Sequence, residues 1–533
     1  MINYKEFAVS DDVAFNIRLA LDYCKANNED GLVFDKGTYF VKRDKAYEKF
    51  FSVSNHGDPG LKRICFLLDG FENFTLDGNG SEFIFKDIMF PVAIDNCKGI
   101  TVKNFVFSSE NTQNAQAEVV RSEKDSFEIR MQTNLPCYVY GEDLYFGAPE
   151  GEHQKAYFFD ECDKDSGLLV AHATDYFFQD PELHIRFSET KDGLIRADGV
   201  KRQICPGNIL IFTSETRCVS NIFINESKDT SVSDVTLYSG IGMGVIAQNS
   251  DGIDIDRFST RIRKGRNYSI NADGTHFVHC KGKISVRNSF FEGQLDDALN
   301  VHGIYLKITE KTEHSLMLKF MHPQTKGIDT VKAGSVIQIS DADSLIPYRK
   351  LNVTGVNKIN FDYLEVFVDE STDGIKSGDV ADEISYAPEV LFENCTVRNN
   401  RARGMLLASA GKTIIRNNLF QTPGSAIKFE SDGKYWYESG GVKDVTITGN
   451  IFENCNYSRW GVAVIVMQPR EKIEDNKYFH GRIEISDNTF KNTSCLLVSA
   501  NNTENLVFQN NKAENCTGGI LKYEHCDTVD IQK

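Results

Sequence analysis

Short runs of alternating apolar and polar residues dominate the chain, and most of them end at an asparagine. Examples are FTLDGNG, ITVKNFVF, ISVRNSFF, CTVRNNR, VTITGNIF and IEISDNTF. A period of two is typical of β-strands with one buried face, and asparagine tolerates the left-handed backbone that a sharp corner requires. Where the pattern is clearest, matching positions such as Val397 and Phe420 lie 23 residues apart. This repeat favours a right-handed parallel β-helix, in which each coil buries its apolar face against its neighbours.

The beginning of the chain has a helical pattern instead. In DDVAFNIRLALDYCKAN, from Asp11 to about Asn27, the apolar positions recur every three or four residues, and Asp11 or Asp12 can serve as the N-cap. The following GLVFDKGTYFV predicts two strands joined by a turn. We therefore expect an N-terminal helix that caps the open end of the β-helix, which would otherwise be an exposed sheet edge.

Two stretches lack the asparagine turns and contain longer alternating strands, such as SFEIRM in the first and LMLKFM and LEVFVD in the second. We interpret both as inserted antiparallel β units with a barrel-like form. The predicted protein is thus all-β and has five parts: 1–109, the cap and first coils; 110–205, the first inserted unit; 206–303, the central coils; 304–388, the second inserted unit; and 389–533, the C-terminal coils.

The composition narrows the range of partners. The formal net charge is −17, which disfavours nucleic acid and anionic surfaces because neither would gain from phosphate neutralisation. A neutral or cationic partner fits this charge better, although acidity can also serve solubility alone. No stretch approaches the ~18 apolar residues of a membrane helix, so we expect no membrane insertion. The N-terminus, MINYKEFAVSDD, does not have the pattern of a signal peptide.

The chain has 13 cysteines and no C-x-x-C pair. Four of them follow an asparagine in the repeated turns: Cys97, Cys395, Cys455 and Cys516. This recurrence predicts buried, stacked thiols in the coils, because free cysteine packs as a small apolar residue. It disfavours a structural zinc site, which needs closely spaced ligands.

An acidic cluster is predicted in NADGTHFVHCKGKISVRNSFFEGQLDDALNVHG, residues 271–303. Asp273 and Asp297 are 24 residues apart, which is about one coil. Neighbouring coils of a β-helix lie roughly 4.8 Å apart, so the two carboxylates should lie on adjacent strands at the same height. Asp296 is next to Asp297 in the sequence, and this brings three carboxyl groups into one patch.

The alternation of apolar residues is interrupted at this cluster. Leu299 and Val301 should face the interior, and strict alternation would bury Asp297 with them at a high desolvation cost. We expect a bend just before Ala298 that turns both Asp296 and Asp297 outward. Clustered acids repel, so one should keep its proton to higher pH while another is ionised, as glycoside hydrolysis requires.

The three aspartates allow other readings. An aspartate triad can hold Ca²⁺, and Asp-Asp pairs in turns are often only solvated. The residues and their spacing do not decide between catalysis, metal binding and a surface turn.

Stacking later coils on the Asp297 strand suggests partners for the acids. In this register Val301 pairs with Leu407 and Phe429. The same register places Arg403 over Asp297. It also aligns His302 with Glu430. An arginine here can orient a sugar hydroxyl or lower a carboxyl pKa, or form a plain surface ion pair. Trp436, in the glycine-flanked run DGKYWYESGG, can stack on a sugar ring or pack its loop on the helix. The candidate substrate-binding residues are His302, Arg401, Arg403, Glu430 and Trp436.

Several motifs together resemble a known family. The order Asn271-x-Asp273, Asp296-Asp297 and His302-Gly303 resembles the active-site layout of polygalacturonase-type β-helix hydrolases. The motifs NADGTHF, GQLDDALNVHG, NNRARGMLL and WYESGGV resemble the α-1,3-galactosidases of glycoside hydrolase family 110, and this resemblance extends from the cap to the last coils.

The resemblance implies an inverting glycosidase without metal or cofactor that acts on terminal α-1,3-linked galactose of blood group B-type glycans. It implies that Asp296 is the general acid and that Asp273 and Asp297 are general bases. The acid and base carboxyl groups of an inverting enzyme are usually separated by roughly 6.5–9.5 Å. It also implies a carbohydrate partner and export from the cell; a homodimer stays open. One departure is the lack of an Arg-x-Lys after His302-Gly303. Arg401-x-Arg403 is the nearest substitute, which favours a neutral hexose over a uronic acid.

Two rival functions remain at this level. The same scaffold carries polysaccharide lyases and uronate epimerases, which abstract a proton beside a carboxylate and use Ca²⁺ or basic residues. A non-catalytic glycan-binding β-helix would leave the three aspartates without a chemical role. The response to a chelator separates the first rival from a hydrolase, and substitution of Asp296 separates the second.

Overall fold

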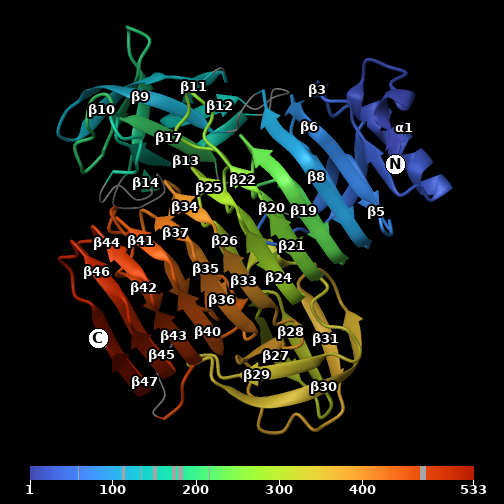
Figure 1. Cartoon of the computed structure of the whole chain (residues 1–533), viewed down its shortest axis with the longest axis vertical. Helices are drawn as coiled ribbons and strands as arrows, with labels where there is room; N and C mark the ends of the chain where they lie inside the picture. The colour runs from blue at the N-terminus through green and yellow to red at the C-terminus, as the bar shows by residue number, and fades with distance from the viewer. Residues whose placement is uncertain are drawn as a thin grey trace.

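The computed structural model describes residues 1–57, 59–110, 114–133, 135–147, 153–170, 176–177, 184–214, 217–468 and 476–532. Short parallel strands stack beside one another from the N-terminal end to the C-terminal end, and one long core runs between them (Figure 1). The predicted parallel β-helix is therefore confirmed.

Three columns of strands form the faces of the coils. The face that carries the acidic cluster contains β18 (Ile222–Asn225), β20 (Val245–Gln248), β23 (Thr275–Val278), β26 (Leu299–Ile304), β35 (Met405–Ala408), β38 (Ile427–Phe429) and β42 (Ala463–Met467). The second contains β21 (Asp251–Asp256), β24 (Lys281–Arg287), β33 (Glu389–Glu393), β36 (Lys412–Arg416), β40 (Asp444–Thr448) and β43 (His480–Ser486). The third contains β22 (Ser259–Thr260), β25 (Phe290–Glu292), β34 (Thr396–Arg398), β37 (Leu419–Gln421), β41 (Ile451–Glu453) and β44 (Thr489–Lys491).

The register on the first face agrees with the sequence pattern. Val301 pairs with Phe277 on one side and Leu407 on the other, and Leu407 pairs with Phe429. All four side chains are buried in the core. The expected stacking of the coils that follow Asp297 is therefore confirmed.

Asparagines form the corners of the coils, as predicted. Asn288, Asn394 and Asn417 have φ values of 51°, 55° and 58°, in the left-handed region that asparagine tolerates. A further row of buried amides runs along the helix from Asn418 through Asn450 and Asn488 to Asn511, with Nδ2–Oδ1 distances of 2.9, 2.9 and 3.0 Å. This row satisfies buried polar groups from one coil to the next.

The turn cysteines carry no disulfide in the part of the chain that the structure describes. Cys97, Cys395 and Cys455 are buried, and Cys516 is only partly buried. Their thiols donate to backbone carbonyl groups, for example Cys395 Sγ to Glu393 O at 3.2 Å. They pack as small core residues, which agrees with the expectation for the three buried ones.

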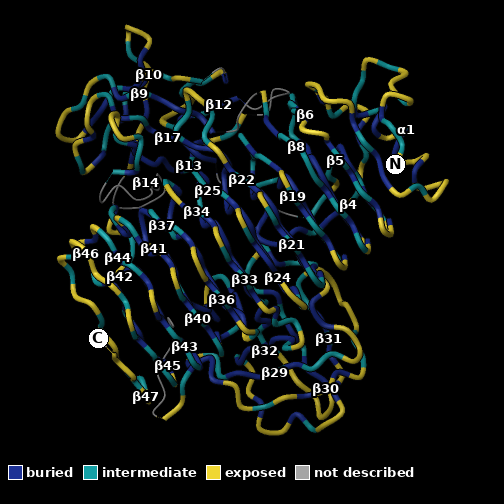
Figure 2. Tube along the Cα trace, in the orientation of Figure 1, coloured by how far each residue is buried: buried dark blue, intermediate teal, exposed yellow. Residues whose placement is uncertain are grey.

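The N-terminal cap is the α-helix α1 (Val13–Asn27), and Asp12 is its N-cap: its side chain accepts from Phe15 N–H at 3.0 Å. The buried face of α1 covers β2 (Gly31–Val33), β3 (Thr38–Val41) and β5 (Gly60–Asp69). Exposed residues gather at turns, at loops of the inserted units and on the last strand, β47 (Leu521–Gln532) (Figure 2). No helix within the described residues has the length and apolar character needed to cross a lipid bilayer.

The first inserted unit is an antiparallel sheet that lies at the top of Figure 1. Its strands are ordered β11 (Cys137–Tyr140), β12 (Asp143–Gly147), β13 (His153–Cys162), β17 (Ile209–Ser214), β9 (Ala115–Ser122), β10 (Ser126–Met131), β16 (Ile195–Asp198) and β15 (Arg186–Glu189). The last strand, β15, lies against β11 and β12, which gives the unit its barrel-like form.

The second inserted unit is a closed antiparallel barrel at the bottom of Figure 1. Its strands are ordered β27 (Leu306–Lys311), β28 (Ser315–Lys319), β31 (Tyr363–Val368), β30 (Pro347–Lys358), β29 (Val336–Ser340) and β32 (Val380–Glu383). The chain leaves the coils after β26 and returns at β33. The coil with Asp297 is therefore in direct contact with a coil that lies 106 residues further along the sequence.

Candidate active site

A cavity of about 450 Å³ opens over the acidic face of the coils. Its floor comes from the coils, and its walls come from both inserted units, from the segment before β5 and from the loop after β38. Its lining includes aromatic, charged and histidine side chains: Tyr157, Phe158, Arg217, Asp273, His276, Asp296, His322, Arg401, Arg403, Glu430, Asp432, Tyr435, Trp436, Glu438 and Trp460.

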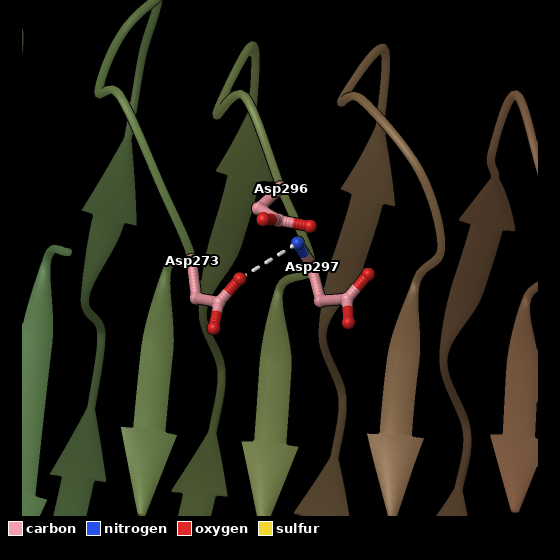
Figure 3. Close-up of side chains that lie close together, drawn as sticks. All are labelled: Asp273, Asp296 and Asp297. Atoms are coloured by element: carbon pink, nitrogen blue, oxygen red, sulfur yellow. Dashed lines mark hydrogen bonds between the residues drawn. The ribbon is translucent and has the colours of Figure 1, made fainter. Parts of the chain in front are cut away.

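Asp273 precedes β23, and Asp296 and Asp297 precede β26 on the next coil. The backbone N–H of Asp297 donates to Asp273 Oδ1 at 3.0 Å, and Figure 3 shows this bond between neighbouring strands. Each aspartate offers an oxygen within 4.8 Å of the others. The one-coil spacing thus brings the three predicted acids together.

This separation is shorter than the roughly 6.5–9.5 Å usual for inverting enzymes. The stacking distance of parallel strands accounts for it, because Asp273 precedes β23 whereas the proposed acid Asp296 and Asp297 precede the adjacent strand β26. The spacing therefore gives no independent support for inversion.

Asp297 does not turn outward as expected. A bend is present at residues 295–296, but the Asp297 side chain is fully buried, and its carboxylate points away from Asp273 toward the next coil (Figure 3). There it meets Arg403, whose Nη2 lies 2.9 Å from Oδ2 and whose Nε lies 3.1 Å from Oδ1. The Arg403 backbone N–H also donates to Oδ1. The bidentate ion pair, rather than exposure to water, offsets the desolvation of this carboxylate.

Asp296 is the member of the triad that faces the cavity most openly, with 15% of its side chain exposed. Three guanidinium groups surround it: Arg217 at 2.9 Å, Arg401 at 3.5 Å and Arg403 at 4.0 Å. Burial acts to raise the pKa of Asp296, but the charges of Arg401, Arg217 and Arg403 outweigh it and hold this pKa below its usual value. Asp296 is therefore ionised near neutral pH.

The other two carboxyl groups are shifted in the opposite direction. Burial, together with the negative charge of Asp296, raises the pKa of Asp273 to about 8. Burial also raises the pKa of Asp297 to about 7, although Arg403 acts against this shift. The triad thus retains a proton near neutral pH, as expected for clustered acids, and the raised pKa of Asp273 favours that carboxyl group as its site.

The predicted residues Arg401, Glu430 and Trp436 all line the cavity. The Arg401 guanidinium lies between two rings, 5.2 Å from the centre of Phe158 and 4.9 Å from that of Trp460. Glu430 forms an ion pair with Lys428. Trp436 packs on His322 of the second inserted unit, with ring centres 4.5 Å apart. These residues give the cavity flat apolar faces with charged groups between them.

His302 lies behind the cavity lining and not in it. Its Nε2 is 2.9 Å from Nε2 of His276, which does line the cavity. The short strand β39 (Glu438–Ser439) pairs with the end of β26 and covers His302. His276 and Glu438 therefore line the cavity beside the position where His302 was predicted to bind substrate.

Arg217 and Asp432 line the cavity and were not predicted from the sequence. Arg217 follows the first inserted unit and reaches Asp296 across 79 residues, and no repeat pattern connects the two. Asp432 accepts the backbone N–H groups of Lys434 and Trp436 and so shapes the Tyr-Trp-Tyr loop. An aspartate before glycine is a usual turn signal, so this second role could have been inferred.

Two family models match the chain. The model described as GLAA-B beta-barrel domain II matches residues 315–381, and the model described as right handed beta helix region matches residues 370–533. The first match falls on the closed barrel and the second on the C-terminal coils.

Curated relatives match over nearly the whole length. The α-1,3-galactosidase A of Shewanella woodyi is 32% identical over 94% of this chain and 83% of its own. The α-1,3-galactosidase B of Bacteroides thetaiotaomicron is 31% identical over 96% and 85%. Among solved structures, the A-module of the Azotobacter vinelandii mannuronan C-5 epimerase AlgE4 aligns with 99% of both chains at 10% identity and a TM-score of 0.41. The identity and coverage of the curated relatives show that the chain belongs to the α-1,3-galactosidases of glycoside hydrolase family 110.

Proposed function

We propose that the protein is an exo-acting, inverting glycoside hydrolase that releases terminal α-1,3-linked galactose from blood group B-type or related glycans. The activity follows the names of the relatives, which are α-1,3-galactosidases. The observation that carries the proposal is the aspartate triad, of which Asp273 and Asp296 line the floor of the cavity and have pKa values shifted in opposite directions. A glycosidase needs neighbouring carboxyl groups in both protonation states, and here a proton must pass to Asp296 before this residue can act as the acid.

The form of the cavity supports attack at a chain end. Its walls come from Tyr157 and Phe158 on one side and from His322 on the other, so both inserted units border the acids. A site enclosed in this way receives the end of a glycan, whereas an open groove along the coils would bind its middle. Its volume is in the range of small-ligand sites.

The lining favours a neutral sugar. Trp436 and Trp460 offer flat faces to the C–H side of a sugar ring, and Glu430 and Asp432 can accept hydrogen bonds from hydroxyl groups. The guanidinium groups of Arg217 and Arg403 already form ion pairs with Asp296 and Asp297. A uronate carboxylate would have to compete with these pairs.

In the proposed reaction Asp296 gives a proton to the glycosidic oxygen, and Asp273 directs the attacking water. Asp297 is not among the described residues that line the cavity, so it acts through its backbone hydrogen bond to Asp273. Because the neighbouring arginines hold the pKa of Asp296 below its usual value, Asp296 must take up a proton before it can act as the acid. The guanidiniums of Arg217 and Arg401 then favour the carboxylate that forms when this proton is transferred. They stabilise the charge that develops in the transition state.

The stereochemistry can be tested directly. Both oxygens of Asp297 are held by Arg403, and both oxygens of Asp273 are hydrogen-bonded, to Asp297 N–H and to His276. A carboxylate whose two oxygens are both engaged in this way is poorly placed to bond to the anomeric carbon. We expect proton NMR early in the reaction to show β-galactose before α-galactose. Initial formation of α-galactose would contradict inversion.

Divalent metal chemistry is the second candidate, because the three carboxylates are close enough to share one cation. Three guanidinium groups within 4.0 Å of the triad would repel such an ion. We therefore expect release of galactose from α-1,3-linked galactobiose and from the branched B trisaccharide to be unchanged by EDTA. Polygalacturonate serves as the control and should not be cleaved. Loss of activity in EDTA, or a product absorbing in the ultraviolet, would favour a lyase instead.

A further inference from the structure

A chain of buried hydrogen bonds begins at Asp273 and leads away from the cavity. Asp273 Oδ2 lies 2.5 Å from Nδ1 of His276, and Nε2 of His276 lies 2.9 Å from Nε2 of His302. Nδ1 of His302 lies 2.7 Å from the carbonyl oxygen of Gly303. All three side chains are almost completely buried. His276 and His302 stand on the neighbouring strands β23 and β26, so the stacking of the coils fixes their distance.

The last acceptor in this series of hydrogen bonds, the carbonyl oxygen of Gly303, determines which atoms carry the hydrogens. A carbonyl oxygen can only accept, so Nδ1 of His302 carries the hydrogen, and Nε2 of a neutral His302 is an acceptor. His276 must then donate from Nε2, which leaves Nδ1 of a neutral His276 without a hydrogen. When both imidazoles are neutral, the short contact between this Nδ1 and Asp273 places a proton on Asp273 Oδ2.

Two further observations agree with this assignment. Asp273 Oδ1 accepts the backbone N–H of Asp297, so the two oxygens of Asp273 have different partners. Burial lowers the pKa of His276 well below its usual value, and the neighbouring His302 lowers it further. Burial raises the pKa of Asp273. Asp273 is thus a neutral acid whose Oδ2 hydrogen points to His276, and its Oδ1 has a second lone pair beside the bond to Asp297 N–H that can accept a proton.

We propose that His276, oriented by His302, is the proton acceptor through which Asp273 acts as a base. This inference rests on the proposed function. As the water oxygen bonds to the anomeric carbon, one water O–H bond breaks and an O–H bond forms at Asp273 Oδ1. At the same time the O–H bond at Oδ2 breaks and an N–H bond forms at His276 Nδ1. The glycosidic C–O bond breaks, and the leaving oxygen takes the proton of Asp296.

The charges in this step balance within the site. Asp273 is neutral before and after, His276 becomes an imidazolium, and Asp296 becomes a carboxylate. The cycle closes when the proton gained by His276 returns through Asp273 to the cavity and Asp296 is protonated again. His276 therefore acts as a positioning residue that stores a proton, and Asp273 relays it.

The groups around His276 determine how stable its cation is. Glu438, whose Oε1 lies 3.5 Å from His302 Nε2, and Asp296 favour the imidazolium. Arg217 and His302 act against it, and His56 of the segment before β5 is a further titratable group nearby. The negative charge on Asp296 thus favours the positive charge on His276, and burial, the largest influence on His276, opposes it.

The main test is the variant His276→Asn. The asparagine amide can still hydrogen-bond to Asp273 but cannot take up a proton. We expect kcat to fall by about 10²–10⁴-fold, with KM within about threefold of the wild-type value. Asp273 must then act as an ordinary carboxylate, so kcat of the variant should rise with pH through about 8, the pKa of Asp273. The wild-type kcat should lack this rising limb.

His279→Asn is the matched control. His279 is equally buried and close in sequence, but it bonds to Asn249 Oδ1 at 2.8 Å, stacks on Tyr386 and does not line the cavity. We expect its kcat and pH profile to match those of the wild type. A folded His276→Asn enzyme with less than about a tenfold loss and an unchanged pH profile would overturn the proposal.

A second measurement needs only the wild-type protein. With ¹⁵N-labelled histidine, the short Asp273–His276 bond should give a proton resonance far downfield of the backbone amides that lacks the one-bond ¹⁵N splitting of an N–H group, because its proton is on Asp273 Oδ2. It should be lost in His276→Asn and kept in His279→Asn. Its absence from the wild type would overturn the proposal even if His276→Asn failed to fold. A failure of the proposed function would give a different result from a failure of this inference, because the wild type would then release no galactose.

Discussion

Replacing Asp296 by asparagine is expected to lower kcat on α-1,3-linked galactosides by about 10²–10⁴-fold, the usual contribution of a general acid. The amide has nearly the same shape but cannot donate an acidic proton to the leaving oxygen. Galactose binding, measured by calorimetry, should be retained because the walls of the cavity are unchanged. Aryl galactosides with strongly acidic leaving groups should lose much less activity, since their departure needs little protonation.

Asp254→Asn is a suitable control for this variant. Asp254 also forms an ion pair with an arginine, Arg287, but it lies on β21 outside the cavity. Its substitution should leave the rates unchanged. Wild-type rates in Asp296→Asn would show that another group is the acid. An equal loss on aryl and natural substrates would point to damage of the cavity and not to loss of proton donation.

Replacing Arg403 by alanine is expected to lower the free energy of unfolding by about 3–5 kcal/mol, because it leaves a buried carboxylate without its partner. Asp297 is completely buried, and both of its oxygens are bound by this one guanidinium. Urea denaturation followed by circular dichroism measures the loss. Activity should fall as well, because Asp297 lies against Asp273.

The loss of stability in Arg403→Ala should depend on pH. Without the guanidinium, the folded-state pKa of Asp297 moves further above its unfolded value, so the folded state favours the protonated form. Stability then declines as pH rises through the folded pKa, and the defect should be largest above neutral pH and smaller in acid. Arg416→Ala removes an exposed ion pair with Glu393 and should cost only about 0–1 kcal/mol at any pH. A similar, pH-independent loss in both variants would contradict the buried-pair argument.

The sequence predicts the coils well because each local rule points to the same fold. Asparagine corners, period-two alternation and a one-coil spacing fix the register in which Val301, Leu407 and Phe429 stack. The same spacing brings Asp273 and Asp297 together. These features depend only on residues within neighbouring coils, so no knowledge of the inserted units is needed.

The surroundings of the acids depend on long-range contacts and are less predictable. Alternation correctly places Asp297 on a buried position, but it cannot show that Arg403 makes this burial tolerable. Arg217 reaches the site from the end of the first inserted unit, whose docking no repeat describes. His302 is removed from the cavity by the strand β39, which folds back over it from a later loop.

The origin of the cavity walls has a consequence for how this enzyme class can diversify. The groups proposed to transfer protons stand on stacked coils, whose spacing is set by backbone hydrogen bonds. The other walls of the cavity, which we propose meet the rest of the glycan, come from the inserted units and from the Tyr-Trp-Tyr loop. Insertions or exchanges in those segments can therefore alter which branches or linkages are accepted while the chemistry is inherited unchanged.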